Sequence, residues 1–343
     1  MLTRAEALDL FQSDDLISVG MEADRIRRKW HPEGVVSYII DRNINYTNFC
    51  TEYCSFCAFY RAPNSPEGYV LPKEVIFDKI QETLDLGGTG VLMQGGLHPD
   101  LKIEWYEDLF RSIKQRFKIH LHCLSAPEVT NIAEISGLSL EDTIARLMDS
   151  GLDSIPGGGA EILDDAVRHR IARLKCRTQE WIDVHRTAHR LGMRTTATMM
   201  FGCGETIEQR MNHLELVRNL QEETGGFTAF IPWTFQRENT SLGRFVKEEA
   251  TAVEYLQTLA ISRIYLENFE NVQSSWVTQG LKTCQLGLRF GGNDVGSIMI
   301  EENVVSAAGA HHQASEEELR RIIRDAGFTP RQRDTLYRTY FLN

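Results

Sequence analysis

Short apolar runs rich in β-branched residues alternate along the chain with longer segments whose apolar residues recur every three or four positions. The short runs predict buried strands, and the longer segments predict the amphipathic helices that follow them. Seven strands are expected, at residues 36–40, 90–94, 119–124, 152–155, 194–201, 227–233 and 271–275. Strands and helices that alternate in this way form parallel β/α units.

Helix boundaries are marked by capping residues. Ser139 and Asp142 fit a capping box, and the same spacing recurs at 206–209 and 315–318. A further unit near residues 288–292 makes seven or eight strands, which favours an α/β barrel of the TIM type over an open sheet. We therefore predict an N-terminal helical extension (1–35), a barrel (36–310) and a C-terminal helical segment packed on it (311–343).

Composition narrows the class of protein. The 343 residues are 42% hydrophobic and 25% charged, and no apolar run approaches the ~18 residues of a membrane span. The net charge of −11 and the lack of a basic stretch argue against nucleic acid as a partner. No hydrophobic signal segment opens the sequence, so we expect a cytoplasmic enzyme.

Three cysteines stand close together in the loop after the first predicted strand, as Cys50-x3-Cys54-x2-Cys57. Three thiolates can hold an iron–sulfur cluster and leave one iron open to a small molecule. A zinc site usually needs a second ligand pair, and none is evident. Seven cysteines are too few and too scattered for a disulfide framework. The four others are expected to be buried.

Other polar or glycine-rich clusters follow the predicted strands. Because catalytic residues of barrels gather at the carboxyl ends of strands, these clusters are expected to face one pocket. Each could instead only form a tight turn. They are 94–98 (Gln-Gly-Gly-Leu-His), 125–128 (Ser-Ala-Pro-Glu), 156–161 (Pro-Gly-Gly-Gly-Ala-Glu), 202–205 (Gly-Cys-Gly-Glu) and 291–294 (Gly-Gly-Asn-Asp).

The cysteine motif, with Phe56 before its last cysteine and a glycine pair after the second strand, resembles that of radical S-adenosylmethionine (SAM) enzymes. The resemblance implies that Cys50, Cys54 and Cys57 bind a [4Fe–4S] cluster whose fourth iron chelates SAM. Phe56 would then lie near the adenine, and the Gln94-Gly95-Gly96 turn would meet the methionine amino group. The superfamily's Gly-Gly-Glu is here Gly-Gly-Leu, which is one departure from its pattern.

Six further segments resemble the branch that contains futalosine-pathway menaquinone enzymes and deazaflavin-forming synthases. They are 42–48, 54–61, 66–70, 231–236, 271–276 and 301–306.

Similarity to the cyclases of that branch implies radical abstraction of the ribose C4′ hydrogen of dehypoxanthine futalosine. The sugar radical then adds to the benzoate ring, and loss of one electron and one proton restores aromaticity. An external one-electron reductant such as flavodoxin or ferredoxin is implied. An aminofutalosine synthase is the alternative enzyme, and an iron–sulfur or zinc binding module is the alternative outside catalysis.

Three charged residues are candidates for contacts to SAM. Glu161 follows three glycines at the end of the fourth strand, where it could contact SAM or only stabilise a helix N-terminus. Arg168 or Lys175 could pair with the methionine carboxylate, or either could lie on a solvated helix face.

Candidates for the substrate side lie further along the chain. Asp294 is the leading candidate for a substrate hydroxyl contact or for accepting the proton, and His98 is a second candidate base that could instead hydrogen-bond its own turn. Trp233 and Trp276 could line an aromatic site or pack in the core.

Overall fold

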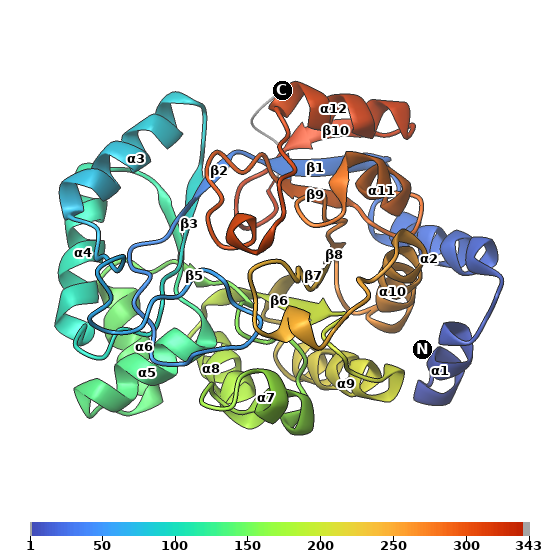
Figure 1. Cartoon of the computed structure of the whole chain (residues 1–343). Helices are drawn as coiled ribbons and strands as arrows, with labels where there is room; N and C mark the ends of the chain where they lie inside the picture. The colour runs from blue at the N-terminus through green and yellow to red at the C-terminus, as the bar shows by residue number, and fades with distance from the viewer. Residues whose placement is uncertain (1, 339–343) are drawn as a thin grey trace.

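The computed structural model describes residues 2–338, and these form two parallel sheets wrapped by helices (Figure 1). One sheet has seven strands in the order β2-β3-β4-β5-β6-β7-β8, and the other has three in the order β10-β1-β9. The strands are β1 (Val35–Ile39), β2 (Asp41–Ile44), β3 (Gly90–Met93), β4 (His120–Cys123), β5 (Ser154–Ile155), β6 (Arg194–Phe201), β7 (Phe227–Thr234), β8 (Asn271–Val272), β9 (Asp294–Ser297) and β10 (Thr329–Gln332).

The two sheets together form a partial barrel. β1 runs into β2 with one residue between them, and a parallel bridge joins Gln273, after β8, to Asp294 in β9. The seven-stranded sheet is built from parallel neighbours throughout, as alternating strands and helices require. The α/β barrel predicted from the sequence is therefore confirmed, with its strands divided between two sheets.

Helices lie outside the strands, and the apolar residues on their inner faces are buried (Figure 1). Ser139, Thr206 and Ser315 are N-caps, as their spacing predicts. The α-helices are α1 (Arg4–Phe11), α2 (Leu16–Trp30), α3 (Lys73–Asp85), α4 (Ile103–Arg116), α5 (Ala126–Ser136), α6 (Leu140–Asp149), α7 (Asp165–Ile171), α8 (Thr178–Arg190), α9 (Ile207–Thr224), α10 (Ala252–Tyr265), α11 (Gly280–Gly287) and α12 (Glu316–Asp325); two 3₁₀ turns are η1 (Leu242–Arg244) and η2 (Ser306–Ala308).

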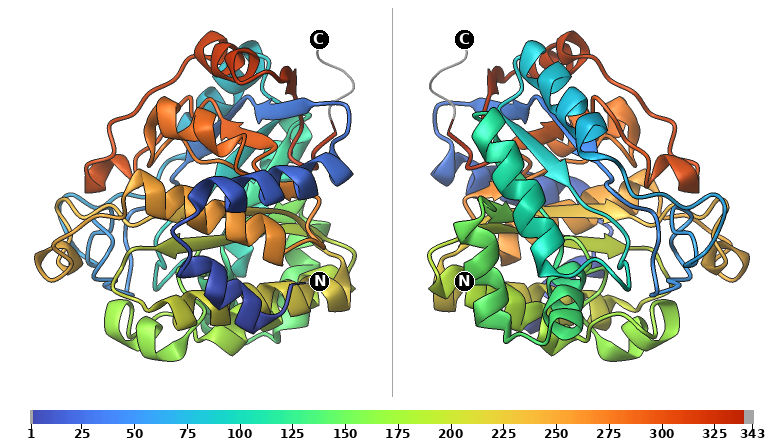
Figure 2. Two further views of the ribbon diagram at one scale, coloured as in Figure 1. Left: turned by 90° about the vertical axis from the view of Figure 1, so that its right-hand side faces the viewer. Right: turned by 90° about the vertical axis from the view of Figure 1, so that its left-hand side faces the viewer.

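The two ends of the chain pack on the barrel in different ways. Helices α1 and α2 lie against α9 and α10 on the outside, as Figure 2 shows. At the other end, α12 is followed by β10, which pairs with β1 in register from Val35 and Thr329. The segment 311–343 thus supplies a strand as well as a helix, while its residues 339–343 lie outside the described part of the chain, as does residue 1 of the extension.

Two elements differ from the sequence-based expectation. Ser125–Glu128, expected as a loop, is the N-cap and first turn of α5, and α7 begins soon after the glycine run. Asp294, expected in a loop near the last strand, is the first residue of β9. Within residues 2–338, no helix combines the length and the hydropathy that a membrane crossing requires.

Candidate active site

A cavity of about 300 Å³ lies inside the partial barrel and is lined by both sheets. At one end are residues that follow β3 and β5, which we call the mouth. At the other end is the segment 333–338 after β10, which we call the floor segment. Apolar side chains form most of the wall between them: Ile39, Leu92, Ile231, Trp233, Val277, Met299, Val304 and Val305.

The cysteine loop is fixed by backbone hydrogen bonds rather than by regular structure. Cys50 N–H donates to the carbonyl of Arg61 at 2.9 Å, and Thr51 N–H donates to that of Leu97 at 3.1 Å. A Cβ atom on Gly96 would lie 2.2 Å from the Phe49 carbonyl oxygen, so only glycine allows this close approach. The cysteine loop and the glycine pair therefore form one packed unit, as the motif predicts.

The three thiols are free of disulfide bonds, and Cys50 and Cys54 are buried while Cys57 is half-buried. Burial raises the pKa of Cys54, and the positive charge of Lys175 opposes that effect. Among residues 2–338, no group of three or more His, Cys, Asp or Glu side chains is arranged to hold a metal ion.

A largely buried ion pair lies beside the cysteine loop. Lys175 Nζ is 2.5 Å from Glu161 Oε1 and 5.2 Å from the centre of the Phe56 ring. Glu161 holds a left-handed backbone (φ 42°), which directs its side chain to the cavity that it lines. Charge attraction to Glu161 and Cys54 raises the pKa of Lys175 despite its burial. The sequence-predicted residues Phe56, Glu161 and Lys175 are therefore brought together.

Arg168 lies nearby but does not face the cavity. It is 2% exposed, and its guanidinium donates to the backbone carbonyls of Gly159, Ala160 and Cys176. These bonds hold the glycine-rich loop in place from behind. Arg168 therefore supports the loop that carries Glu161, rather than presenting a cation to a ligand.

A buried carboxylate holds the other glycine turn. Glu128 Oε1 accepts hydrogen bonds from Gly95 N–H at 2.9 Å and from the Tyr46 hydroxyl at 2.6 Å, and Oε2 accepts from the Ser125 hydroxyl at 2.6 Å. Burial outweighs these donors and raises the pKa of Glu128 to about 7. Gln94, the first residue of this turn, lines the cavity and donates to the Leu124 carbonyl.

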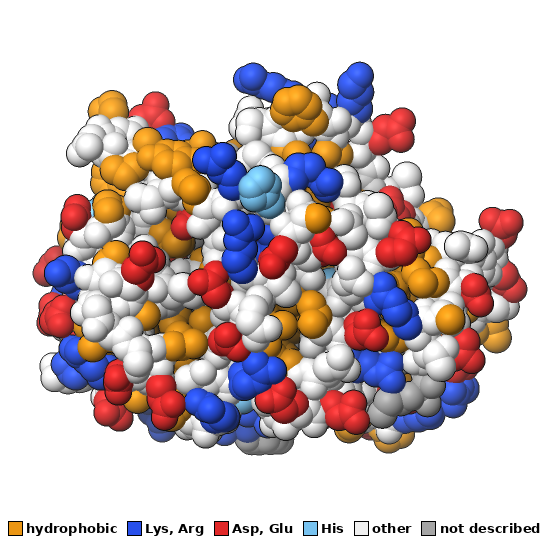
Figure 3. All heavy atoms as spheres, turned by 90° about the horizontal axis from the view of Figure 1, so that it is seen from below, with side chains coloured by type: hydrophobic (Ala, Val, Ile, Leu, Met, Phe, Trp, Pro, Cys, Tyr) orange, Lys and Arg blue, Asp and Glu red, His pale blue; other side chains and the backbone are white. Residues whose placement is uncertain are grey.

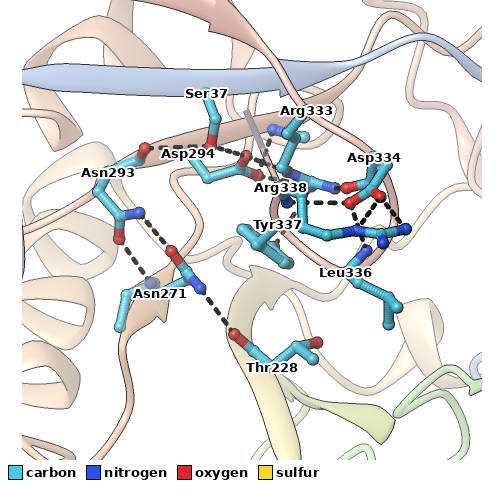
Figure 4. A network of polar contacts seen from close by, with 12 residues as sticks. Ser37, Thr228, Asn271, Asn293, Asp294, Arg333, Asp334, Leu336, Tyr337 and Arg338 are labelled. Atoms are coloured by element: carbon cyan, nitrogen blue, oxygen red, sulfur yellow. Dashed lines mark hydrogen bonds and ion pairs between the residues drawn. The ribbon is translucent and has the colours of Figure 1, made fainter. Parts of the chain in front are cut away.

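Asp294 belongs to a polar network at the floor (Figure 4). Its carboxylate accepts from Arg333 Nε at 2.5 Å and from a second guanidinium nitrogen at 3.0 Å, from the Ser37 hydroxyl at 2.6 Å, and from Gly296 N–H at 2.8 Å. Its exposed fraction is 0%, and it is not among the cavity-lining residues. The structure thus places Asp294 behind the cavity, with four donors on its two oxygens.

The three remaining candidates are placed differently from one another. His98 Nδ1 accepts from Asp100 N–H at 3.1 Å, which is the hydrogen bond to its own turn, and its ring packs on Phe49. Trp233 lines the cavity. Trp276 is 2% exposed, packs in the core beneath β1, and donates to the Ser297 carbonyl at 3.0 Å.

The outer surface carries charge of both signs. On the face seen in Figure 3, acidic and basic side chains are interspersed over the surface. This mixture of signs agrees with a net charge of only −11 for a chain of 343 residues.

Two family models together match most of the chain. The model described as "Radical SAM superfamily" matches residues 44–217, and "CofH/MqnC C-terminal region" matches residues 224–342. The chain belongs to the radical SAM superfamily. The first model covers the cysteine loop and the strands β3 to β6, and the second covers the strands β7 to β10 and the floor segment, whereas β1 lies outside both models.

Curated relatives of this radical SAM chain align along nearly its whole length. Cyclic dehypoxanthine futalosine synthase of Halalkalibacterium halodurans is 51% identical over 98% of this chain and 90% of its own. The Streptomyces coelicolor protein of the same name is 46% identical over 98% and 85%. A 5-amino-6-(D-ribitylamino)uracil–L-tyrosine 4-hydroxyphenyl transferase from Methanococcoides burtonii is 42% identical over 98% and 95%.

Solved structures share the fold at low identity. Methylornithine synthase superimposes with a TM-score of 0.74 at 18% identity and covers 96% of this chain and 94% of its own. The FeFe-hydrogenase maturase HydG from Carboxydothermus hydrogenoformans gives 0.77 at 16% identity and covers 99% and 78%. At these identities the likeness extends to the fold.

The donor set of the loop fits the cluster that the radical SAM family implies. Three free thiols lie on one loop, with a largely buried lysine and a cavity beside it, and a three-cysteine cluster with an open iron needs such a set of thiols. Burial raises the pKa of Cys50 and of Cys54, and the positive charge of Lys175 opposes that effect at both thiols.

Sequence reasoning missed the polar residues inside the barrel. Asp41 and Asn43 of β2 and His122 of β4 line the cavity, as do Arg333 and Tyr337 of the floor segment. The signal for the first three is strand alternation, because polar residues at every second position of a strand share one face. No local pattern marks the last two, which reach the cavity through the pairing of β10 with β1.

Proposed function

We propose that this chain is a radical SAM cyclase that converts dehypoxanthine futalosine to cyclic dehypoxanthine futalosine in the futalosine pathway of menaquinone biosynthesis. The observation that carries the proposal is 51% identity to a cyclic dehypoxanthine futalosine synthase across 98% of the chain. The cysteine loop, the glycine turns and the cavity lie within the aligned region.

In this proposal the chain's own residues hold the two cofactors side by side. Cys50, Cys54 and Cys57 bind the [4Fe–4S] cluster. The turn at Gly95 and Gly96 presents backbone groups to the methionine part of SAM, and Glu161 with Lys175 contacts SAM from the opposite side of the mouth. When bound, the cluster and SAM would supply the acceptor for a substrate hydrogen atom.

The cavity then has to orient the ribose and benzoate parts of one substrate. Its apolar wall, including Trp233, suits the aromatic ring, and Asp41 and Asn43 offer polar contacts for sugar hydroxyls. Enclosure keeps water and reductants from a reactive substrate radical. Positioning matters most here, since a 1 Å displacement can cost roughly 100-fold in rate.

The balance of the reaction sets the assay. The substrate loses one hydrogen atom from ribose C4′, then one electron and one proton from the ring, so the product is two hydrogens lighter. Each turnover releases methionine and 5′-deoxyadenosine. An external one-electron reductant, such as flavodoxin or ferredoxin, starts each cycle.

The test incubates anaerobically reconstituted, reduced protein with SAM and dehypoxanthine futalosine and analyses the products by mass spectrometry. We expect 5′-deoxyadenosine together with a product two hydrogens lighter, and neither from Cys54→Ala, which removes one cluster ligand. If the lighter product is absent, aminofutalosine formed from the enolpyruvyl precursor would assign the chain as an aminofutalosine synthase instead of a cyclase. A hydroxyphenyl adduct formed from tyrosine and ribitylaminouracil would assign it as a hydroxyphenyl transferase.

A further inference from the structure

A chain of hydrogen bonds runs along one face of the neighbouring strands β4 and β5. His122 Nδ1 lies 2.6 Å from the Ser154 hydroxyl oxygen, and the same oxygen lies 2.7 Å from His120 Nε2. His122 and Ser154 are partners in the parallel register of the two strands, and His120 precedes His122 by two positions on the same face. One serine hydroxyl thus joins two imidazoles, because it can donate to one and accept from the other.

The two ends of this chain lie in different spaces. His122 lines the interior cavity, and its Nε2 makes no hydrogen bond with any residue from 2 to 338. His120 lines a separate pocket on the outside, at the amino-terminal ends of the strands, together with Asp153 and Asp334. The floor segment lies between the two spaces, since Thr335 lines the cavity and Asp334 lines the outer pocket. The His-Ser-His chain is therefore a polar path past the floor segment.

The charges around the path favour proton movement outward. Burial, His120 and Arg333 lower the pKa of His122 to about 3, so this imidazole is neutral at rest. Burial also lowers the pKa of His120, whereas Asp153 and Asp334 raise it and Lys114 and Arg338 lower it. Asp153 is paired with Lys114 and Asp334 with Arg338, and these two carboxylates still raise the pKa of the outer imidazole. The charges that act on the inner imidazole, those of His120 and Arg333, both lower its pKa, so a proton is better stabilised at the outer one.

We propose that His122, Ser154 and His120 form a proton exit path that carries the ring proton of each cyclisation from the cavity to the outer pocket. The inference rests on the proposed function, because that reaction releases a proton inside the barrel. The ring C–H bond breaks and its electron pair restores the aromatic system. One electron of the ring radical leaves to a one-electron acceptor of the iron–sulfur class, and the proton goes to His122 Nε2.

The proton then moves by two transfers along existing hydrogen bonds. His122 passes its Nδ1 proton to Ser154, and the Ser154 hydroxyl passes its own to His120 Nε2. His120 releases its Nδ1 proton to water in the outer pocket. Each imidazole then carries its remaining proton on Nε2, so both rings have to change tautomer, by exchange with water in the cavity and in the outer pocket, before the next cyclisation. Asp294 cannot accept the ring proton without losing hydrogen bonds from Arg333, because these bonds occupy its carboxylate oxygens. Asp41 also lines the cavity, but no hydrogen-bonded path leads outward from its carboxylate among the described residues.

The experiment compares Ser154→Ala with Ser150→Ala in the reconstituted enzyme. Both serines are 2% exposed, but the Ser150 hydroxyl donates to the Arg146 carbonyl at the end of α6, away from the path. The measured quantity is cyclised product per 5′-deoxyadenosine, because hydrogen abstraction precedes proton release. We expect Ser154→Ala to lower this ratio about tenfold or more, since positioned proton transfer contributes ~10²–10⁴ in rate. Ser150→Ala should keep the wild-type ratio.

A second variant protects the test against misfolding. His120→Ala opens space at the outer pocket, and imidazole in the buffer should restore at least half of the lost ratio; circular dichroism checks its fold. The proposed path is overturned if the ratio of cyclised product to 5′-deoxyadenosine is unchanged in both Ser154→Ala and His120→Ala. It is also overturned if this ratio falls only in Asp41→Asn. Wild-type protein that makes no lighter product at all would instead refute the proposed function, which separates the two failures.

Discussion

The mouth and the floor of the cavity each contain a buried carboxylate paired with a cation, yet the two pairs are built differently. Glu161 receives one hydrogen bond, from Lys175 at 2.5 Å, and lines the cavity. Asp294 receives four, two of them from Arg333, and lies behind the cavity wall. One carboxylate keeps free acceptor sites that face a ligand space, and the other has its acceptor sites filled.

This difference separates a binding charge from a structural one. A carboxylate with unfilled lone pairs beside a cavity can exchange protein contacts for ligand contacts at little cost. A fully bonded buried pair cannot, because loss of either partner leaves an uncompensated charge. The expected phenotypes are therefore loss of ligand affinity at the mouth and loss of stability at the floor.

The largest effect is expected from Asp294→Asn. This change leaves Arg333 buried without its counter-charge, which costs about 3–5 kcal/mol of unfolding free energy. Urea unfolding followed by circular dichroism measures it. A loss below ~1 kcal/mol together with an abolished reaction would mean that Asp294 acts on the substrate, as the sequence first suggested, and that the contrast between the two pairs is wrong.

Glu128→Gln should produce the next largest effect, and it depends on pH. The folded pKa of Glu128 lies near 7 and its ordinary value is 4.5, so folding favours the protonated form. Stability from this group is present below pH 4.5 and is lost as the pH rises to 7. The wild type should lose up to about 3 kcal/mol across this window relative to the variant, at about 1.4 kcal/mol per pKa unit.

Parallel urea titrations of wild type and Glu128→Gln at pH 5 and pH 7.5 measure that difference. Glu128 holds the turn at Gly95 from below, so its contribution to the mouth is structural even though it lies beside the binding loops. Equal pH dependence in both proteins would show that Glu128 is ionised throughout.

Glu161→Gln should have the smallest effect on stability and a clear effect on binding. The amide still accepts a hydrogen bond from Lys175, and the thiolates beside Lys175 retain negative charge. We expect about tenfold weaker SAM binding, equal to ~1.4 kcal/mol, by calorimetry on cluster-loaded protein. Unfolding free energy should change by less than in Asp294→Asn; the reverse order would remove the distinction between mouth and floor.

Local signals in the sequence were sufficient for most of the elements. β6 matches its predicted range, 194–201, and the N-caps at Ser139, Thr206 and Ser315 are where the spacing places them. Such features depend on residues close in sequence, so propensity and capping determine them. The same logic explains one error: Ser125 and Glu128 have the spacing of a helix start but were interpreted as a site loop.

The site could be predicted most fully where one motif contains its residues. The cysteine loop and the Gly95-Gly96 turn are contiguous motifs, and the structure packs them together. Arg168 and Asp294 could not be assigned, because whether a charge faces a ligand or a carbonyl depends on neighbours distant in sequence. Arg333 reaches the cavity only through the pairing of β10 with β1, which no local pattern encodes.

That pairing also determines when the barrel can be completed during synthesis. β1 has β9 on one side and β10 on the other, and both partners emerge more than 250 residues after it. At translation rates of ~5–20 residues per second, β1 waits for tens of seconds with both edges unpaired. The cysteine loop leaves the ribosome well before the floor segment, so a nascent chain can receive its cluster through an end of the barrel that is still open.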